Sequence, residues 1–194
     1  MLKRFILLVT LGVVSGGLMA LDQPDFIVLE TFAATENETV EIRQYPAFTV
    51  ASVAIDGDIK DAGNKGFRLL ADYIFGNNEA DEKIAMTAPV FQSRIADDSQ
   101  KVSFYLTEST DSVPTPVNSR VAIESSEMTV AVVRYKGGWG IRKYEEHLEK
   151  LVAQLDLNDS WQISGEAIWA RYDPPFKPPW WRTNEVMLPV SRVP

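Results

Sequence analysis

The first regular pattern of hydrophobic positions covers residues 40–45 and 48–55, which are rich in β-branched and aromatic side chains. This pattern predicts two strands, and Pro46 between them predicts a tight corner. Over residues 59–75 the apolar positions take a helical period instead, and Gly76 with the two asparagines after it ends the predicted helix. The apolar face of this helix consists of Ile59, Ala62, Gly63, Gly66, Leu69, Leu70, Tyr73 and Ile74.

The pattern recurs in the second half of the chain. Residues 128–137 match residues 48–57 at five of ten positions, and a second amphipathic helix is predicted over residues 141–155. Further strands are predicted near residues 86–95, 101–106, 166–172 and 185–190. Neither half can bury the apolar face of its helix alone. We therefore expect one α+β domain with approximate twofold symmetry, an antiparallel sheet with two helices packed against it.

Composition and charge exclude several classes of protein. The 194 residues are 45% hydrophobic and 24% charged, which is typical of a globular domain with one core. The net charge is −8 and no basic run interrupts the acidic surplus, so we expect no nucleic-acid partner. The chain has no cysteine and a single histidine, His147, which excludes thiol chemistry and multi-histidine metal sites. We predict no catalytic residues and no metal ligands.

The first twenty residues have the layout of a secretory signal. Lys3 and Arg4 precede an apolar run over residues 5–14, and small residues follow it. The run is short for a membrane span. We expect the signal to be removed, with the exact cleavage site open, leaving a single domain over residues 21–194 in the periplasm or an equivalent exported compartment. An N-terminal anchor that is not cleaved is the alternative.

Short segments in a characteristic order carry a family resemblance. They are residues 41–46 (EIRQYP), 83–90 (KIAMTAPV), 171–176 (RYDPPF) and 182–186 (RTNEV). Together they resemble the SOUL heme-binding protein family, and the resemblance extends over residues 28–190. It implies a distorted β-barrel of two antiparallel sheets flanked by two long helices. It also implies a carrier or buffer that binds heme or metal-free porphyrin reversibly, in a shallow apolar cleft beside the first helix.

The sequence departs from the family pattern at two places. Relatives often carry two adjacent arginines before the Asn-Glu-Val element, where this chain has Arg182 followed by Thr183. Some relatives have a histidine near the start of the domain that has been proposed as an axial heme ligand, whereas the histidine of this chain is His147. We therefore predict that a tetrapyrrole binds without an axial histidine.

The first helix supplies most of the candidate binding residues. Glycine inside a helix costs roughly 1 kcal/mol relative to alanine, so Gly63 and Gly66 predict either a close approach of the helix to the sheet or a trough for a flat ligand. Lys65 and Arg68 are candidates to pair with heme propionates, although a solvated helix face explains them equally well. Met86 offers a thioether, but methionine in such a strand is more often a core residue. The predicted cofactor-binding residues are Gly63, Lys65, Gly66, Arg68, Leu69, Tyr73 and Met86.

An aromatic loop near the C-terminus has two interpretations. Phe176, Trp180 and Trp181 are interleaved with four prolines, so the loop is stiff and either lies over a flat ligand or seals the open end of a barrel. Two other functions also stay open for the chain. One is a small-molecule sensor or protein-interaction module on the same scaffold. The other is a hydrolase, although the sequence has no Gly-x-Ser-x-Gly motif.

Overall fold

Strands are the main regular elements of the computed structural model, which describes residues 21–33 and 38–193. The predicted secretory signal lies outside the described residues. No helix within the described part of the chain is long and apolar enough to cross a membrane. In chain order the elements are β1 (Ile27–Ala33), β2 (Thr39–Asp56), α1 (Ile59–Ile74), β3 (Val90–Ala96), β4 (Ser99–Leu106), β5 (Ala122–Lys136), α2 (Ile141–Leu155), β6 (Trp161–Ile163), β7 (Ile168–Arg171), the 3-10 turn η1 (Pro179–Trp181) and β8 (Thr183–Arg192).

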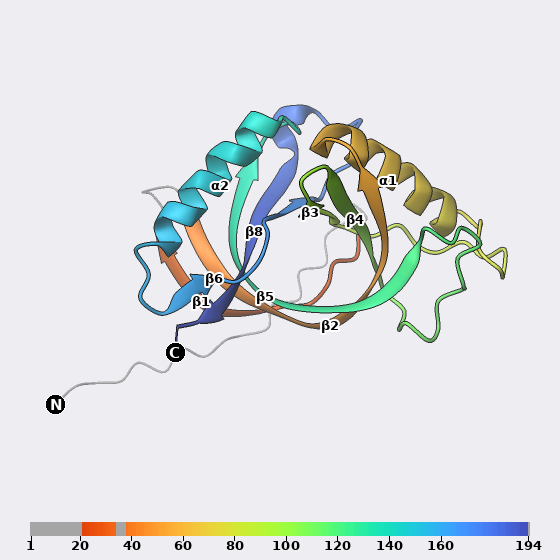
Figure 1. Ribbon diagram of the computed structural model, residues 1–194, viewed down its shortest axis with the longest axis horizontal. Helices are drawn as coiled ribbons and strands as arrows, with labels where there is room; N and C mark the ends of the chain where they lie inside the picture. The colour runs from red at the N-terminus through yellow and green to blue at the C-terminus, as the bar shows by residue number, and fades with distance from the viewer. Residues whose placement is uncertain (1–20, 34–37, 194) are drawn as a thin grey trace.

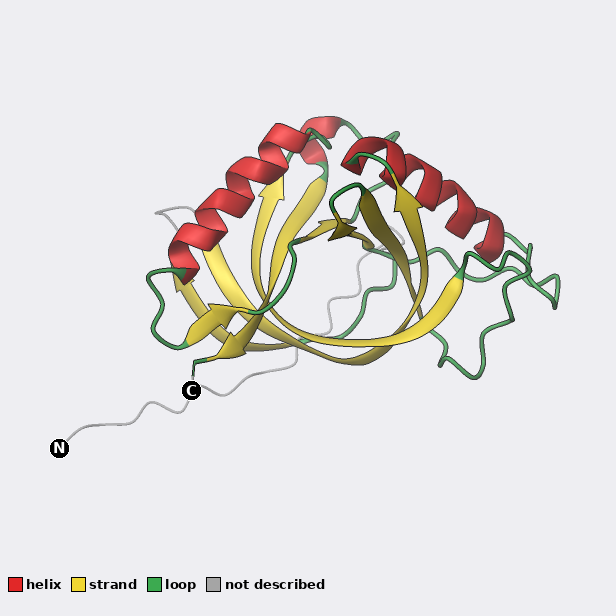
Figure 2. Cartoon of the chain, viewed as in Figure 1, coloured by secondary structure: helices red, strands yellow, loops and turns green. Residues whose placement is uncertain are grey.

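Six strands close into an antiparallel barrel (Figure 1). Around the ring the order is β2, β4, β3, β7, β8 and β5, and β5 pairs again with β2. β1 pairs with the first part of β2 outside the ring, and β6 pairs with the end of β8. Both helices lie against the outside of the barrel (Figure 2). The predicted α+β class with an antiparallel barrel is therefore confirmed.

β2 is one continuous strand that runs through Pro46. The predicted corner at this residue is therefore wrong. The β2–β5 register shifts by one residue between Tyr45 and Phe48, which is a β-bulge, and a bulge tolerates a proline because it leaves a ladder position unpaired. The extra residue also reverses which side chains of β2 face outward. Ile42 before the bulge packs in the cluster beneath α2, whereas Ala51 after it packs in the cluster beneath α1.

Three apolar clusters fill the molecule. Two of them lie between the barrel and a helix, and there Leu70 of α1 and Leu151 of α2 are buried. The third consists of strand residues alone and fills the barrel interior, as side chains do in small barrels. Its buried members are Tyr45, Phe91, Val130, Val132, Ala170 and Met187.

The two halves of the barrel share one connectivity. The unit β2-α1-β3-β4 places its strands in the order β2-β4-β3, and the unit β5-α2-β7-β8 places its strands in the order β5-β8-β7. That the two halves superpose about a twofold axis stays a prediction.

α1 lies close to β4, and Gly66 makes this approach possible. A Cβ atom at Gly66 would lie 2.7 Å from Cγ2 of Val102. We expect Gly66→Ala to lower the free energy of unfolding by about 1–3 kcal/mol, because overpacking outweighs the better helix propensity of alanine. Urea titration measures the change. Lys65→Ala on the exposed side of the same helix is the control and should change stability little. A Gly66→Ala protein at least as stable as wild type would show that α1 can move away from β4.

Candidate functional site

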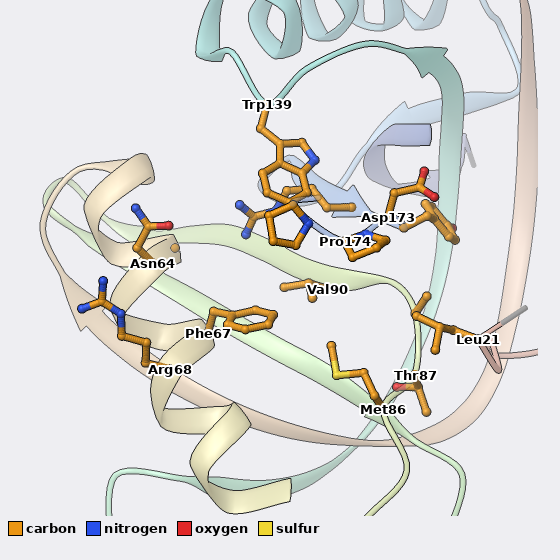
Figure 3. Close-up of a pocket in the computed structure, with 15 residues that line it drawn as sticks. Leu21, Asn64, Phe67, Arg68, Met86, Thr87, Val90, Trp139, Asp173 and Pro174 are labelled. Atoms are coloured by element: carbon orange, nitrogen blue, oxygen red, sulfur yellow. The ribbon is translucent and has the colours of Figure 1, made fainter. Parts of the chain in front are cut away.

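A cleft of about 250 Å³ lies outside the barrel, between α1 and the segment that follows β7. Figure 3 shows the side chains of Phe67, Met86 and Trp139 directed toward its middle from different sides. Ligand sites usually span roughly 300–1,000 Å³, so this cleft leaves part of a large ligand in solvent. The residues that line it are Leu21, Gly63, Asn64, Phe67, Arg68, Met86, Thr87, Ala88, Val90, Trp139, Arg171, Tyr172, Asp173, Pro174 and Pro175.

The stripe of α1 that faces the cleft lies beside its apolar face. Asn64, Phe67 and Arg68 are three and four residues apart and so share one side of the helix. The ring of Phe67 also contacts Phe104 of the barrel edge-on, with 5.2 Å between ring centres. One feature of the sequence could have indicated this stripe. Phe67 is a large aromatic residue that lies outside the predicted apolar face of the helix.

Three of the seven predicted binding residues, Gly63, Arg68 and Met86, line the cleft. Whether they contact a ligand stays a prediction. Lys65 is exposed on the same helix and is not one of the lining residues. The structure brings together part of the predicted set and leaves the rest elsewhere on α1.

The other three predicted residues belong to the core beneath α1. Gly66 packs against β4, Leu69 packs against the apolar cluster under the helix, and buried Tyr73 donates a hydrogen bond of 2.8 Å to the carbonyl oxygen of Pro114. Of the two alternatives for the helix glycines, the structure shows the close approach to the sheet at Gly66, whereas Gly63 lines the cleft and the trough for a flat ligand stays a prediction there. At Gly63 the side chain of Gln92 takes the space, since a Cβ would lie 2.6 Å from Gln92 Oε1.

Arg171, at the end of β7, is a lining residue that the sequence analysis did not single out. Its Nη2 donates a hydrogen bond of 2.9 Å to Gln92 Oε1. Its guanidinium carbon lies 5.2 Å from the ring centre of Trp169 and 5.7 Å from that of Trp139, within the range of cation–π contacts. Burial lowers the pKa of Arg171 to about 10, so the side chain stays charged at neutral pH. The cleft therefore holds a fixed positive charge.

Asp173 is the acidic residue of the cleft, and its charge is already paired. It accepts hydrogen bonds from Lys177 Nζ and from the backbone N–H of Thr183. Burial alone would raise the pKa of Asp173, but these donors outweigh it and lower the pKa. The carboxylate holds the loop after β7 in place and leaves the net charge of the cleft positive.

Tyr172 forms part of the cleft wall and is held from inside the barrel. Its hydroxyl donates a hydrogen bond of 2.5 Å to Glu185, a fully buried carboxylate. Burial, and then the charge of Glu185, raise the pKa of Tyr172 well above its usual value. Glu185 also accepts from Arg43 Nη1 at 3.0 Å and from Arg134 Nε at 2.7 Å. A buried charge cluster thus positions one wall of the cleft.

His147 lies away from the cleft-lining residues, on α2. Its ring stacks on Tyr135 with 4.2 Å between ring centres, and Nδ1 lies 3.5 Å from Glu38 Oε1. Burial lowers the pKa of His147, which favours the neutral imidazole.

The aromatic loop projects into solvent. Phe176, Trp180 and Trp181 are 87%, 68% and 63% exposed. The expectation that this loop seals the barrel is therefore wrong, because the interior is filled by strand side chains. Pro174 and Pro175, at the start of the loop, line the cleft. The position of the loop beside the cleft keeps the other interpretation, a cover over a bound ligand, as a prediction.

Comparison with known proteins matches most of the described chain to one family. The family model described as SOUL heme-binding protein matches residues 21–189. Heme-binding protein 2 of Homo sapiens is 33% identical over 167 residues, or 80% of either chain, and that of Mus musculus is 34% identical over 159 residues, or 76% of either chain. Among solved structures, the EcmrR C-terminal domain has a TM-score of 0.62 at 12% identity, covering 81% of this chain and 99% of that one. At that identity the likeness concerns the fold alone.

Removing the charge of Glu185 tests the buried cluster. We expect Glu185→Gln to lower the free energy of unfolding by about 3 kcal/mol, because two arginines lose a buried counter-charge. Glu124→Gln is the matched control, since Glu124 pairs with Lys101 in a half-exposed ion pair and should cost less than about 1 kcal/mol. Urea titration of both variants measures the difference. Equal losses would mean that Glu185 stabilises the barrel no more than a surface carboxylate does.

Proposed function

This chain belongs to the SOUL heme-binding protein family, and we propose that it is an exported, non-catalytic carrier or buffer that binds heme or metal-free porphyrin reversibly in the cleft beside α1. The observation that carries the proposal is the combination of apolar walls and fixed positive charge in one cleft of an acidic protein. A tetrapyrrole combines a flat apolar ring with acidic substituents, so its two parts match the two parts of the cleft.

The apolar walls suit a flat ring. Phe67, Met86 and Pro174 offer an aromatic face, a flexible thioether and a rigid aliphatic ring to the same space (Figure 3). Burial of apolar surface stabilises a complex by roughly 25 cal/mol per Å², without any bond to a metal. Because the cleft is small, part of the macrocycle stays in solvent. The smaller buried area limits the affinity and so favours reversible binding.

The charges suit acidic substituents. Arg68 stands at the α1 side of the cleft, with the exposed Lys65 on the same helix. Asp173 offers no free negative charge because Lys177 neutralises it. A propionate can therefore approach the cleft without meeting an unpaired carboxylate of its lining.

Binding without an axial histidine agrees with the position of His147. This side chain packs between Tyr135 and Glu38 on α2, so it would have to leave both to reach a ligand beside α1. Met86 is the lining side chain with a soft donor atom, and its thioether is a weak ligand for heme iron. We therefore propose that burial of the ring and pairing of charges supply most of the binding affinity.

The proposal predicts the outcome of absorbance titrations with hemin and metal-free protoporphyrin. Wild type and His147→Ala should bind both compounds with similar affinity. Lys65→Glu/Arg68→Glu should bind both several-fold more weakly, with a larger loss at low salt because exposed charge pairs are screened. Lys150→Glu/Arg192→Glu makes the same change in net charge away from the cleft and should bind as wild type does.

Two results would overturn the proposal. A Soret shift that disappears in His147→Ala would mean that iron ligation from α2 controls binding. If wild type binds neither compound, the scaffold serves as a sensor or interaction module instead.

Export is a separate part of the proposal and is supported by the layout of residues 1–20. Expression of the full chain in a Gram-negative host should place the protein in the periplasmic fraction. Its intact mass should correspond to a first residue between Leu18 and Asp22. Replacing Lys3 and Arg4 by glutamate should retain the precursor. A soluble cytoplasmic wild-type protein that keeps Met1 would contradict export.

A further inference from the structure

Three arginines of this protein, Arg43, Arg134 and Arg171, differ in how their charge is compensated. Arg43 pairs with Glu41 and Glu185, and Arg134 also pairs with Glu185. Arg171 forms no ion pair with any of the residues that the structure describes. A charge that is removed from water without a partner is costly, so a persistent one requires another source of compensation.

The surroundings of Arg171 hold its guanidinium in a fixed orientation. Trp139 and Trp169 offer their ring faces to it, and Gln92 Oε1 accepts from Nη2. Gln92 is itself fixed, because its Nε2 donates to the carbonyl oxygen of Ile59 at the start of α1 at 2.6 Å. A guanidinium carries five N–H donors, and within the described chain this is the one side-chain hydrogen bond that Arg171 makes.

Other donors near Arg171 also lack acceptors. Nε1 of Trp139 and Nε1 of Trp169 are buried and have no hydrogen-bond partner among the described residues. Trp139 lines the cleft, and Trp169 is almost fully buried. A buried donor without a partner costs about 1–3 kcal/mol. At this end of the cleft, Arg171 and the Nε1 of Trp139 are therefore donors that remain open to a ligand.

We propose that this end of the cleft is a carboxylate subsite, in which Arg171 binds an acidic group of the ligand beside Trp139. A carboxylate supplies about four acceptor positions and a negative charge, and both are what this set of donors lacks. The ligand class is an organic acid with a flat apolar body, since Phe67 and Met86 form the adjoining walls. The same charge disfavours a lipophilic cation.

The subsite also predicts how a bound tetrapyrrole is oriented in the cleft. This part of the inference rests on the proposed function. One propionate of a bound tetrapyrrole points inward to Arg171, and the other lies at the mouth near Arg68. The cleft then distinguishes an acidic macrocycle from a neutral one of the same shape.

Paired ligands test this distinction. Wild type should bind protoporphyrin at least tenfold more tightly than protoporphyrin dimethyl ester, which has the same ring and no free carboxylate. Arg171→Gln should lose about ten- to a hundredfold in affinity for the acid, the range for a hydrogen bond to a charged group, and little for the ester. Arg68→Gln, at the mouth, is the matched control and should lose less.

The thermal stability of the empty protein gives a second measurement. Because Arg171 is a partly buried charge with no ion-pair partner among the described residues, Arg171→Gln without ligand should melt at or above the temperature of wild type. A strong fall in the melting temperature would show that Arg171 is a structural residue and would overturn the subsite. Equal affinity of wild type for acid and ester, or an equal loss of both in Arg171→Gln, would also overturn it while leaving tetrapyrrole binding intact.

A smaller probe separates the subsite from the proposed function. If wild type binds no porphyrin, the proposed function fails, and the subsite is then judged on 1-pyrenebutyrate against the neutral 1-pyrenebutanol and the cation tetraphenylphosphonium. The subsite stands if pyrenebutyrate is preferred and if Arg171→Gln removes the preference. It is overturned if pyrenebutyrate does not bind, or if the alcohol or the cation binds as tightly.

Discussion

The pairing of β2 with β5 is the contact on which the rest of the structure depends. It closes the ring of six strands, and the enclosed space is then filled by side chains of the strands themselves. Both helices must therefore bury their apolar faces on the outer wall. Because they cover different parts of that wall, the space between α1 and the end of β7 is left as the cleft. The position of the candidate site follows from barrel closure.

Closure also explains how one strand serves both helices. β2 would present the same alternate residues to one surface along its length if it were regular. The bulge at Pro46 changes the alternation, so Ile42 faces α2 and Ala51 faces α1. The sequence pattern shows that Pro46 separates two apolar stretches. A corner between two strands and a bulge within one strand would both give this pattern. The register that decides between them involves β5, which is distant in the sequence.

Periodicity predicted the elements that bury a regular face. The second helix, predicted over residues 141–155, has those bounds in the structure, and the first ends at Ile74, one residue before the predicted end. β1 and β6 were not predicted. β6 has three residues, too few to show a period, and the apolar residues of β1 are largely exposed, so no core selects their alternation. The local sequence predicts an element where one face of it is regularly buried. It does not predict a strand that is held by backbone pairing alone.

The candidate site was harder to predict because its chemistry depends on pairing. Gly63, Arg68 and Met86 could be named from local pattern and resemblance, and each lines the cleft. Arg171 belongs to the motif of residues 171–176, but the sequence does not show whether an arginine will form an ion pair in the fold. Only the arrangement of β3, β7 and the loop before α2 shows that this guanidinium faces Trp139 and an amide rather than a carboxylate. Glu185 compensates Arg43 and Arg134, whereas Arg171 has no carboxylate partner among the described residues and lies at the cleft, which is why the proposed subsite is centred on it.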